Sequence, residues 1–315
     1  MVPETRHRIL ICHPNASVYR EILTKRLPEA EIRSAEKPGE ALEFVEKAEI
    51  IFAWRHIPDD LLKKAKNLRW FASLGAGNEG LVKNPYLPVT AMFTKSTVYG
   101  EMMAEYVFAY LLYFRRDLPK YLEDQKRKVW DQILPGRLRG QTLGIVGLGS
   151  VGREIAKRGK QFGMSVLGIK RDPERVENVD QVFGPGEIEK LIPLTDTLII
   201  AIPLTPETYH ILGERQLNLM KEGTLLINIG RGKTVDEQAL VKVLKTGRIR
   251  AVLDVFEEEP LSPESELWTL QNVVITPHVS GINLPDEVCE GFVQNYERWV
   301  KNEPLTGLVD RNKGY

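Results

Sequence analysis

The stretch Leu143–Gly152, LGIVGLGSVG, decides the fold of one half of this chain. Gly147, Gly149 and Gly152 have G-x-G-x-x-G spacing, directly after an apolar strand pattern and before the helical pattern REIAKRGKQFG. The first glycine permits a tight turn, the second lets backbone approach a pyrophosphate, and the third lets helix pack on strand. The helix then points its amides and positive dipole end at the phosphates. Glycine-rich turns are common, but this order of elements predicts a dinucleotide-binding unit.

The strand that follows ends at Lys170, where NAD sites place an acid about 20 residues beyond the glycines. A lysine cannot accept hydrogen bonds from ribose hydroxyls. Lys170 and Arg171, together with Arg175, could instead pair with a 2′-phosphate. The alternatives are a solvated basic turn, or a ribose contact from Asp172. We therefore expect NADP(H) to be preferred, with NAD(H) also possible.

Composition excludes several classes of partner. The 43 basic residues balance the 43 acidic ones, so no net field favours nucleic acid or an anionic membrane. Cys12 and Cys289 lie far apart without CxxC spacing, which indicates neither a disulfide framework nor a metal site. No run approaches the ~18 apolar residues of a membrane span, and the amino terminus lacks an export signal. A cytoplasmic protein with a small-molecule partner is expected.

Length and pattern predict two α/β domains. A chain of 315 residues exceeds one usual domain. Short apolar runs alternate with helical patterns, which is typical of doubly wound parallel sheets. We expect four strands in a first unit that ends near residue 96 and six in a second: 8–12, 31–35, 49–55 and 69–75, then 142–149, 165–171, 196–202, 224–230, 249–255 and 272–277.

The ends of the chain should belong to one domain, because termini often pack together. Residues 1–98 and 285–315 then form one domain, and residues 99–284 are inserted into it as the other. The inserted part begins with the pattern of one long helix, 100–118, which is apolar nearly all round. Such a helix must be covered by another domain or subunit, so we expect a homodimer.

Three polar segments follow strands at the sheet edge where open α/β folds bind ligands. They are INIGRGKTVD with Arg231, LDVFEEEPL with Glu259, and TPHVSG with His278. Each alone is compatible with an ordinary surface loop. Together they supply a cation for a carboxylate, an imidazole for proton transfer and a carboxylate to orient it.

These motifs, in this order with GIVGLGSVG, make the chain resemble the D-isomer-specific 2-hydroxyacid dehydrogenase family over essentially its whole length. Within the family it is most similar to the glyoxylate/hydroxypyruvate reductase A branch. That similarity rests on SLGAGNEG, GEMMAEYVFAYLLYFRR, PLSPESELW and LVDRNKGY. The resemblance implies a flavodoxin-like substrate domain with an inserted Rossmann domain that binds NAD(P).

The resemblance also implies a reaction. Small 2-oxo acids, glyoxylate and hydroxypyruvate first, would be reduced to 2-hydroxy acids by hydride from NADPH. His278 would donate the proton, Glu259 would orient and favour the protonated ring, and Arg231 would clamp the carboxylate. Further substrate contacts are expected from Arg55 and from the backbone of three residues in LGAG: Gly75, Ala76 and Gly77.

The implied cofactor contacts come from the whole inserted domain. Asp254 is expected either near the nicotinamide carboxamide or as a capping residue. Met103 is expected either to contact the nicotinamide or to belong to the core. No metal is expected. The implied contacts are Gly147, Gly149, Ser150, Val151, Gly152, Lys170, Arg171, Pro203, Thr208, Ile229, Gly230, Asp254, Ser280 and Gly281.

Two departures from the family pattern leave alternatives open. Lys170 replaces the acid of NAD-preferring members, and Asn78-Glu79 stands where relatives often have Val-Asp. One alternative is an NAD-linked dehydrogenase of D-lactate, D-3-phosphoglycerate or a bulkier D-2-hydroxy acid. A dinucleotide-sensing binding protein is less favoured, because the three residues of the acid-base set are all present.

Overall fold

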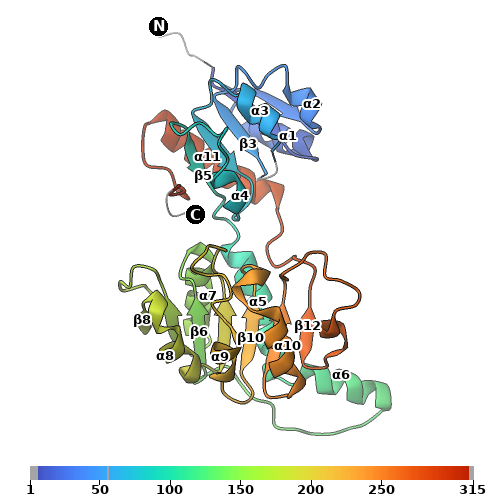
Figure 1. The fold of residues 1–315 in the computed structure, drawn as a ribbon. Helices are drawn as coiled ribbons and strands as arrows, with labels where there is room; N and C mark the ends of the chain where they lie inside the picture. Colours follow the sequence, from blue (N-terminus) through green and yellow to red (C-terminus); the bar gives the residue numbers. More distant parts are fainter. Residues whose placement is uncertain (1–5, 55–56, 312–315) are drawn as a thin grey trace. The chain divides into compact units, whose positions relative to one another are not determined.

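The computed structural model describes residues 6–54 and 57–311 and divides the chain into two compact units (Figure 1). Unit 1 consists of Met1–Val98 and Asn283–Tyr315, and unit 2 of Tyr99–Ile282. The second crossing, expected between residues 284 and 285, falls between Ile282 and Asn283. Unit 2 is thus an insertion within unit 1.

Unit 1 contains a parallel five-stranded sheet in the order β2-β1-β3-β4-β5, the flavodoxin-like arrangement. The prediction of four strands missed β5, a three-residue strand whose short pattern includes one exposed methionine. The strands are β1 Arg8–Cys12, β2 Glu31–Ala35, β3 Ile50–Ala53, β4 Trp70–Ser73 and β5 Met92–Thr94.

The C-terminal helix α11, Pro285–Val300, completes the core of unit 1. Its Phe292 ring stacks on Trp70 of β4 with centroids 5.1 Å apart and lies 4.5 Å from Phe52 of β3. This packing explains why the chain returns to its first domain. The other helices are α1 Ala16–Arg26, α2 Pro38–Ala41, α3 Asp59–Lys64 and α4 Glu79–Val82.

Unit 2 contains a parallel seven-stranded sheet in the order β12-β11-β10-β9-β6-β7-β8. If β6 is counted as strand 1, the strands from β8 to β11 have the Rossmann order 3-2-1-4-5-6. Strand β12 is one further strand beyond β11. The prediction of six strands missed β8, which has only three residues at the sheet edge. The strands are β6 Thr142–Val146, β7 Ser165–Ile169, β8 Gln181–Phe183, β9 Thr197–Ile200, β10 Leu225–Asn228, β11 Arg250–Leu253 and β12 Val273–Ile275.

The long apolar pattern at the start of unit 2 forms a helix as predicted, but this helix ends at Arg115 and not at Leu118. Helix α5, Gly100–Arg115, packs against α7, Ser150–Gln161. Asp117 has a left-handed backbone with φ 51°, which interrupts the helix before α6, Leu118–Arg127. Nor is α5 buried all round, since Glu101 and Glu105 are exposed. One face of α5 therefore joins the core of unit 2.

The remaining helices connect the strands of unit 2 (Figure 1). The α-helices are α7 Ser150–Gln161, α8 Ile188–Leu191, α9 Glu214–Asn218 and α10 Glu237–Lys245. The 3-10 helices are η1 Pro185–Glu187, η2 Ile192–Leu194, η3 Gly232–Thr234 and η4 Glu266–Thr269. No helix in the described ranges is long and apolar enough to cross a membrane.

The glycines between β6 and α7 have different structural requirements. Gly147 has φ 107°, a conformation that side chains disfavour. A Cβ on Gly152 would lie 1.9 Å from the Gly147 carbonyl oxygen, so helix and strand could not pack as they do. A Cβ on Gly149 would meet nothing within 4 Å. Gly152 is therefore required by the fold, whereas Gly149 faces open space.

Gly152→Ala and Gly149→Ala should separate these requirements in the cofactor-free protein. Because the backbone at Gly152 has no room, Gly152→Ala should lower the free energy of unfolding by about 1–3 kcal/mol. Gly149→Ala should change it by less than about 0.5 kcal/mol. Urea denaturation followed by circular dichroism measures both; equal losses would contradict the assignment.

Candidate active site

The centre of the candidate site is an imidazole–carboxylate pair on the loops that follow β11 and β12. His278 Nδ1 lies 2.8 Å from Glu259 Oε2. The other oxygen, Glu259 Oε1, accepts a hydrogen bond from the Phe256 amide at 3.1 Å. Both side chains remain accessible, with exposed fractions of 41% and 37%. Glu259 thus fixes the ring through Nδ1 and leaves Nε2 as the nitrogen that can exchange a proton with a ligand.

Asp254, at the end of β11, holds the loop that carries His278. Its carboxylate is completely buried and accepts hydrogen bonds from Thr276 Oγ1 at 2.6 Å and from the amides of Val279 and Ser280 at 2.8 and 2.9 Å. The Asp254 carbonyl also accepts the His278 amide at 2.9 Å. Of the two roles expected for Asp254, these contacts support the capping role.

Tyr106 extends this network to α5. Its hydroxyl lies 2.5 Å from Thr276 Oγ1, and burial raises the pKa of Tyr106. On the same helix, Met103 packs against Gly281, where a Cβ would lie 3.2 Å from its sulfur. Sequence reasoning did not identify Tyr106 or Thr276. The threonine stands in the quoted TPHVSG, but nothing in the sequence shows that a tyrosine some 170 residues earlier reaches it.

Arg231 follows β10, the strand next to β11, and its main chain is fixed from two sides. The Arg231 carbonyl accepts hydrogen bonds from Asn228 Nδ2 at 3.2 Å and from Thr234 Oγ1 at 2.6 Å. A Cβ on the next residue, Gly232, would lie 1.8 Å from the Phe256 carbonyl carbon. The arginine loop therefore packs directly on the chain that leads to Glu259. Asn228 and Thr234 were not predicted as site residues.

The basic side chains expected at a 2′-phosphate lie after β7. Lys170 is mostly buried and forms an ion pair with Glu174, while Arg171 is exposed. The hydrogen bond from Lys170 holds the pKa of Glu174 below its usual range. A phosphate at Lys170 would therefore compete with the Glu174 carboxylate. Glu174 was not predicted as a site residue, although it stands four positions after the lysine, within VLGIKRDPER.

The other predicted cofactor residues lie around the same edge of the sheet. Thr208 Oγ1 donates to the Pro203 carbonyl at 2.7 Å and closes a turn after β9. Ile229 is 4% exposed and its side chain belongs to the core, so it offers a ligand its backbone only. Gly230 is buried, and a Cβ there would lie 2.8 Å from a carbonyl oxygen. At the start of α7, Ser150 is exposed and Val151 half-buried.

The predicted anion loop, Gly75–Gly77, follows β4 in unit 1. The Gly75 amide donates to Ser73 Oγ at 3.2 Å, whereas the amides of Ala76 and Gly77 donate to no group in the described part of the chain. Asn78, which departs from the family pattern, is 4% exposed, and its Oδ1 has no partner among the described residues. Arg55 lies outside the described residues.

The chain is similar to known proteins over most of its length. Residues 108–280 match the model of the D-isomer specific 2-hydroxyacid dehydrogenase NAD binding domain. Glyoxylate/hydroxypyruvate reductase A of Yersinia enterocolitica is 30% identical over 98% of this chain and 99% of its own length. D-3-phosphoglycerate dehydrogenase of Methanocaldococcus jannaschii is 33% identical over 86% of this chain, but the chain spans only 53% of that relative.

A solved structure shows the same architecture. The D-isomer specific 2-hydroxyacid dehydrogenase of Xanthobacter autotrophicus Py2 in complex with NADPH and MES has a TM-score of 0.87. It is 29% identical, and the match covers 98% of this chain and 99% of that one. With the family model matching more than half of the sequence, the chain belongs to the D-isomer-specific 2-hydroxyacid dehydrogenase family.

Proposed function

We propose that the protein reduces small 2-oxo acids, glyoxylate and hydroxypyruvate first, to 2-hydroxy acids with hydride from NADPH. The observation that carries this proposal is the 2.8 Å contact between His278 Nδ1 and Glu259 beside the Arg231 loop. A carboxylate-oriented imidazole is well suited to protonate a carbonyl oxygen, because histidine is the most common general acid in enzymes. The similarity to a glyoxylate/hydroxypyruvate reductase A supports the substrate class.

In this mechanism the bound cofactor supplies the hydride that goes to the 2-oxo carbon. His278 donates its Nε2 proton to the carbonyl oxygen, while Glu259 keeps the ring oriented and stabilises its charged form. Arg231 pairs with the substrate carboxylate through two parallel hydrogen bonds and polarises the adjacent carbonyl. The amides of Ala76 and Gly77, which donate to no described group, supply a neutral anion nest.

NADPH is the proposed reductant because Lys170 and Arg171 replace the usual acid after the second strand. The related Xanthobacter enzyme was solved with NADPH. A second candidate is an NAD-linked dehydrogenase of a larger D-2-hydroxy acid. The 33% sequence identity with a D-3-phosphoglycerate dehydrogenase favours this candidate. The ion pair between Lys170 and Glu174 favours it too, because it makes Lys170 less available to a 2′-phosphate.

One steady-state experiment separates the two candidates. Catalytic efficiency is measured with NADPH and with NADH on glyoxylate, hydroxypyruvate and a set of bulkier 2-oxo acids. We expect the highest catalytic efficiency with NADPH and the two small acids. The efficiency with NADPH should exceed that with NADH by about tenfold or more, since each 1.4 kcal/mol of phosphate binding is worth a factor of ten. Negligible turnover of both small acids beside fast bulky substrates would refute the proposal.

Variants of the basic turn provide the control for that experiment. In Lys170→Asp with Arg171→Ala the NADPH advantage should collapse, because the phosphate loses its cations and meets a new carboxylate. Glu174→Gln should increase the advantage, because it frees Lys170 from its ion pair. An unchanged cofactor ratio in both variants would show that the turn is only a charged surface.

We also propose a cytoplasmic homodimer. Cys12 and Cys289 are both free thiols, which suits a reducing compartment. Cell fractionation tests the cytoplasmic location. Helix α6 and the segment after it expose large apolar side chains: Leu122 at 52%, Trp130 at 91% and Leu134 at 100%. Such a cluster is unusual on a monomer and supports coverage by a second copy.

Sedimentation velocity at micromolar concentration tests the dimer. The parent protein should sediment as a dimer, and Leu122→Glu with Leu134→Glu should shift it to the monomer because charges cannot be buried in an apolar interface. Val89→Glu is the matched control, since Val89 is an equally apolar residue with an exposed fraction of 88% in unit 1. A monomeric parent, or a dimer that survives both leucine changes, would rule out this interface.

A further inference from the structure

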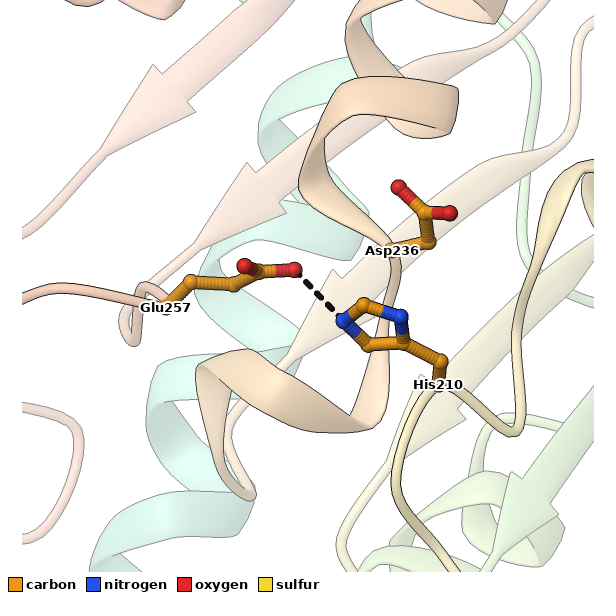
Figure 2. A group of neighbouring side chains, drawn as sticks. All are labelled: His210, Asp236 and Glu257. Carbon is orange, nitrogen blue, oxygen red and sulfur yellow. Dashed lines mark hydrogen bonds and ion pairs between the residues drawn. The ribbon is translucent and has the colours of Figure 1, made fainter.

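A second group of ionisable side chains lies on the Rossmann unit, separate from the His278–Glu259 pair. His210, Asp236 and Glu257 each offer a ligand atom, and these atoms lie within 4.8 Å of one another. The three residues come from the segments that follow β9, β10 and β11 (Figure 2). In the described part of the chain this is the one group that brings three such ligands together.

One pair of atoms in this group is close to the spacing of neighbouring metal ligands, whereas a cation would draw the other atoms in from separations of up to 4.8 Å. His210 Nε2 lies 2.8 Å from Glu257 Oε1, as the dashed line in Figure 2 marks. Neighbouring ligands at about 2.0–2.2 Å from a zinc ion are about 3.0–3.5 Å apart. The two atoms therefore need to separate by only a few tenths of an ångström for a cation to take the place of the proton that they share.

Asp236 adds the third ligand without losing its structural role. It is the N-cap of α10, and its Oδ1 accepts the Ala239 amide at 2.9 Å. Because a carboxylate has two oxygens, Oδ2 can serve as the ligand while Oδ1 continues to cap the helix.

The charge around the imidazole is strongly negative. Glu237 and Glu257 each accept a hydrogen bond from the other's amide, at 3.2 and 3.1 Å, so a third carboxylate lies beside the group. The two carboxylates of the group and the neighbouring Glu237 thus gather acidic side chains near one histidine, and a divalent cation would compensate them better than a single proton does.

The main chain holds the ligands near these positions independently of their side chains. The His210 amide donates to the Lys233 carbonyl at 2.9 Å, and the Asp236 amide donates to the Leu212 carbonyl at 3.0 Å. His210 itself has a left-handed backbone with φ 48°, a conformation that non-glycine residues rarely adopt. The segments after β9 and β10 are therefore already joined, which reduces the entropy lost when a cation binds.

We propose that His210, Asp236 and Glu257 form a structural binding site for a borderline divalent cation of the Zn²⁺ type. One imidazole nitrogen and two carboxylate oxygens match this class, whereas Ca²⁺ takes six to eight oxygens. All three residues are partly exposed, so water completes the coordination shell. The cation ties together the segments that carry Thr208, Arg231 and Glu259. The inference does not depend on the proposed substrate or cofactor.

Zn²⁺ binding to the tag-free, chelator-treated full-length protein tests the proposal. Isothermal titration calorimetry should show one site per chain, and differential scanning calorimetry should show a Tm that rises with Zn²⁺ and falls back with EDTA. His210→Asn, Glu257→Gln and Asp236→Asn should each weaken binding by about tenfold or more, because a direct ligand contributes at least as much as the groups that orient it. Asn remains a good N-cap, so Asp236→Asn keeps α10 and removes only the charge.

His278→Asn is the matched control, because His278 also lies 2.8 Å from a glutamate. Within the described ranges neither His278 nor Glu259 belongs to a three-ligand group. Zn²⁺ affinity and the Zn²⁺-dependent Tm shift should be unchanged in that variant. The proposal is overturned if the parent shows no saturable Zn²⁺ binding up to about 1 mM, the weak end of the affinities known for calcium modules. It is equally overturned if His210→Asn and Asp236→Asn titrate like the parent, or if binding disappears with His278→Asn instead.

Discussion

The buried carboxylate of Asp254 is the constraint on which the geometry of the candidate site depends. It has no exposed surface, and its three hydrogen bonds to Thr276, Val279 and Ser280 fix the loop that carries His278. Leaving such an acceptor unpaired would cost about 1–3 kcal/mol or more, so the loop has one strongly favoured conformation. That conformation presents the His278 ring to Glu259, whose second oxygen is held by the chain itself. A single buried carboxylate therefore positions the exposed His278–Glu259 pair.

The fold was largely predictable because strong local signals agreed with one another. Strand periodicity and the glycine spacing of LGIVGLGSVG indicated two doubly wound sheets, and both sheet orders are those of the flavodoxin and Rossmann folds. The errors occur where the local signal is short or where the backbone breaks a pattern. Strands β5 and β8 have three residues each, too few to show alternation. The break between α5 and α6 depends on the left-handed Asp117, which no hydrophobic pattern reveals.

The pairing of His278 with Glu259 was predictable, but most of the contacts that hold the site together were not. His278, Glu259 and Arg231 follow neighbouring strands, and their approach was expected from the sheet edge alone. Contacts made through space were not: Tyr106 reaches Thr276 across the sequence, and Gly232 must lack a side chain because it lies against Phe256. A short-range contact was missed too. Lys170 was considered as a free cation, whereas its charge is shared with Glu174.

The most direct test of the central claim is the steady-state rate of 2-oxo acid reduction by His278→Asn and Glu259→Gln, with Glu258→Gln as the control at an exposed neighbouring position. His278→Asn should lose about 10²- to 10⁴-fold in kcat/KM. Glu259→Gln removes the carboxylate that holds the ring through Nδ1, so it should lose about 10²-fold in kcat/KM while Glu258→Gln matches the parent. Full activity in His278→Asn or in Glu259→Gln would contradict the account.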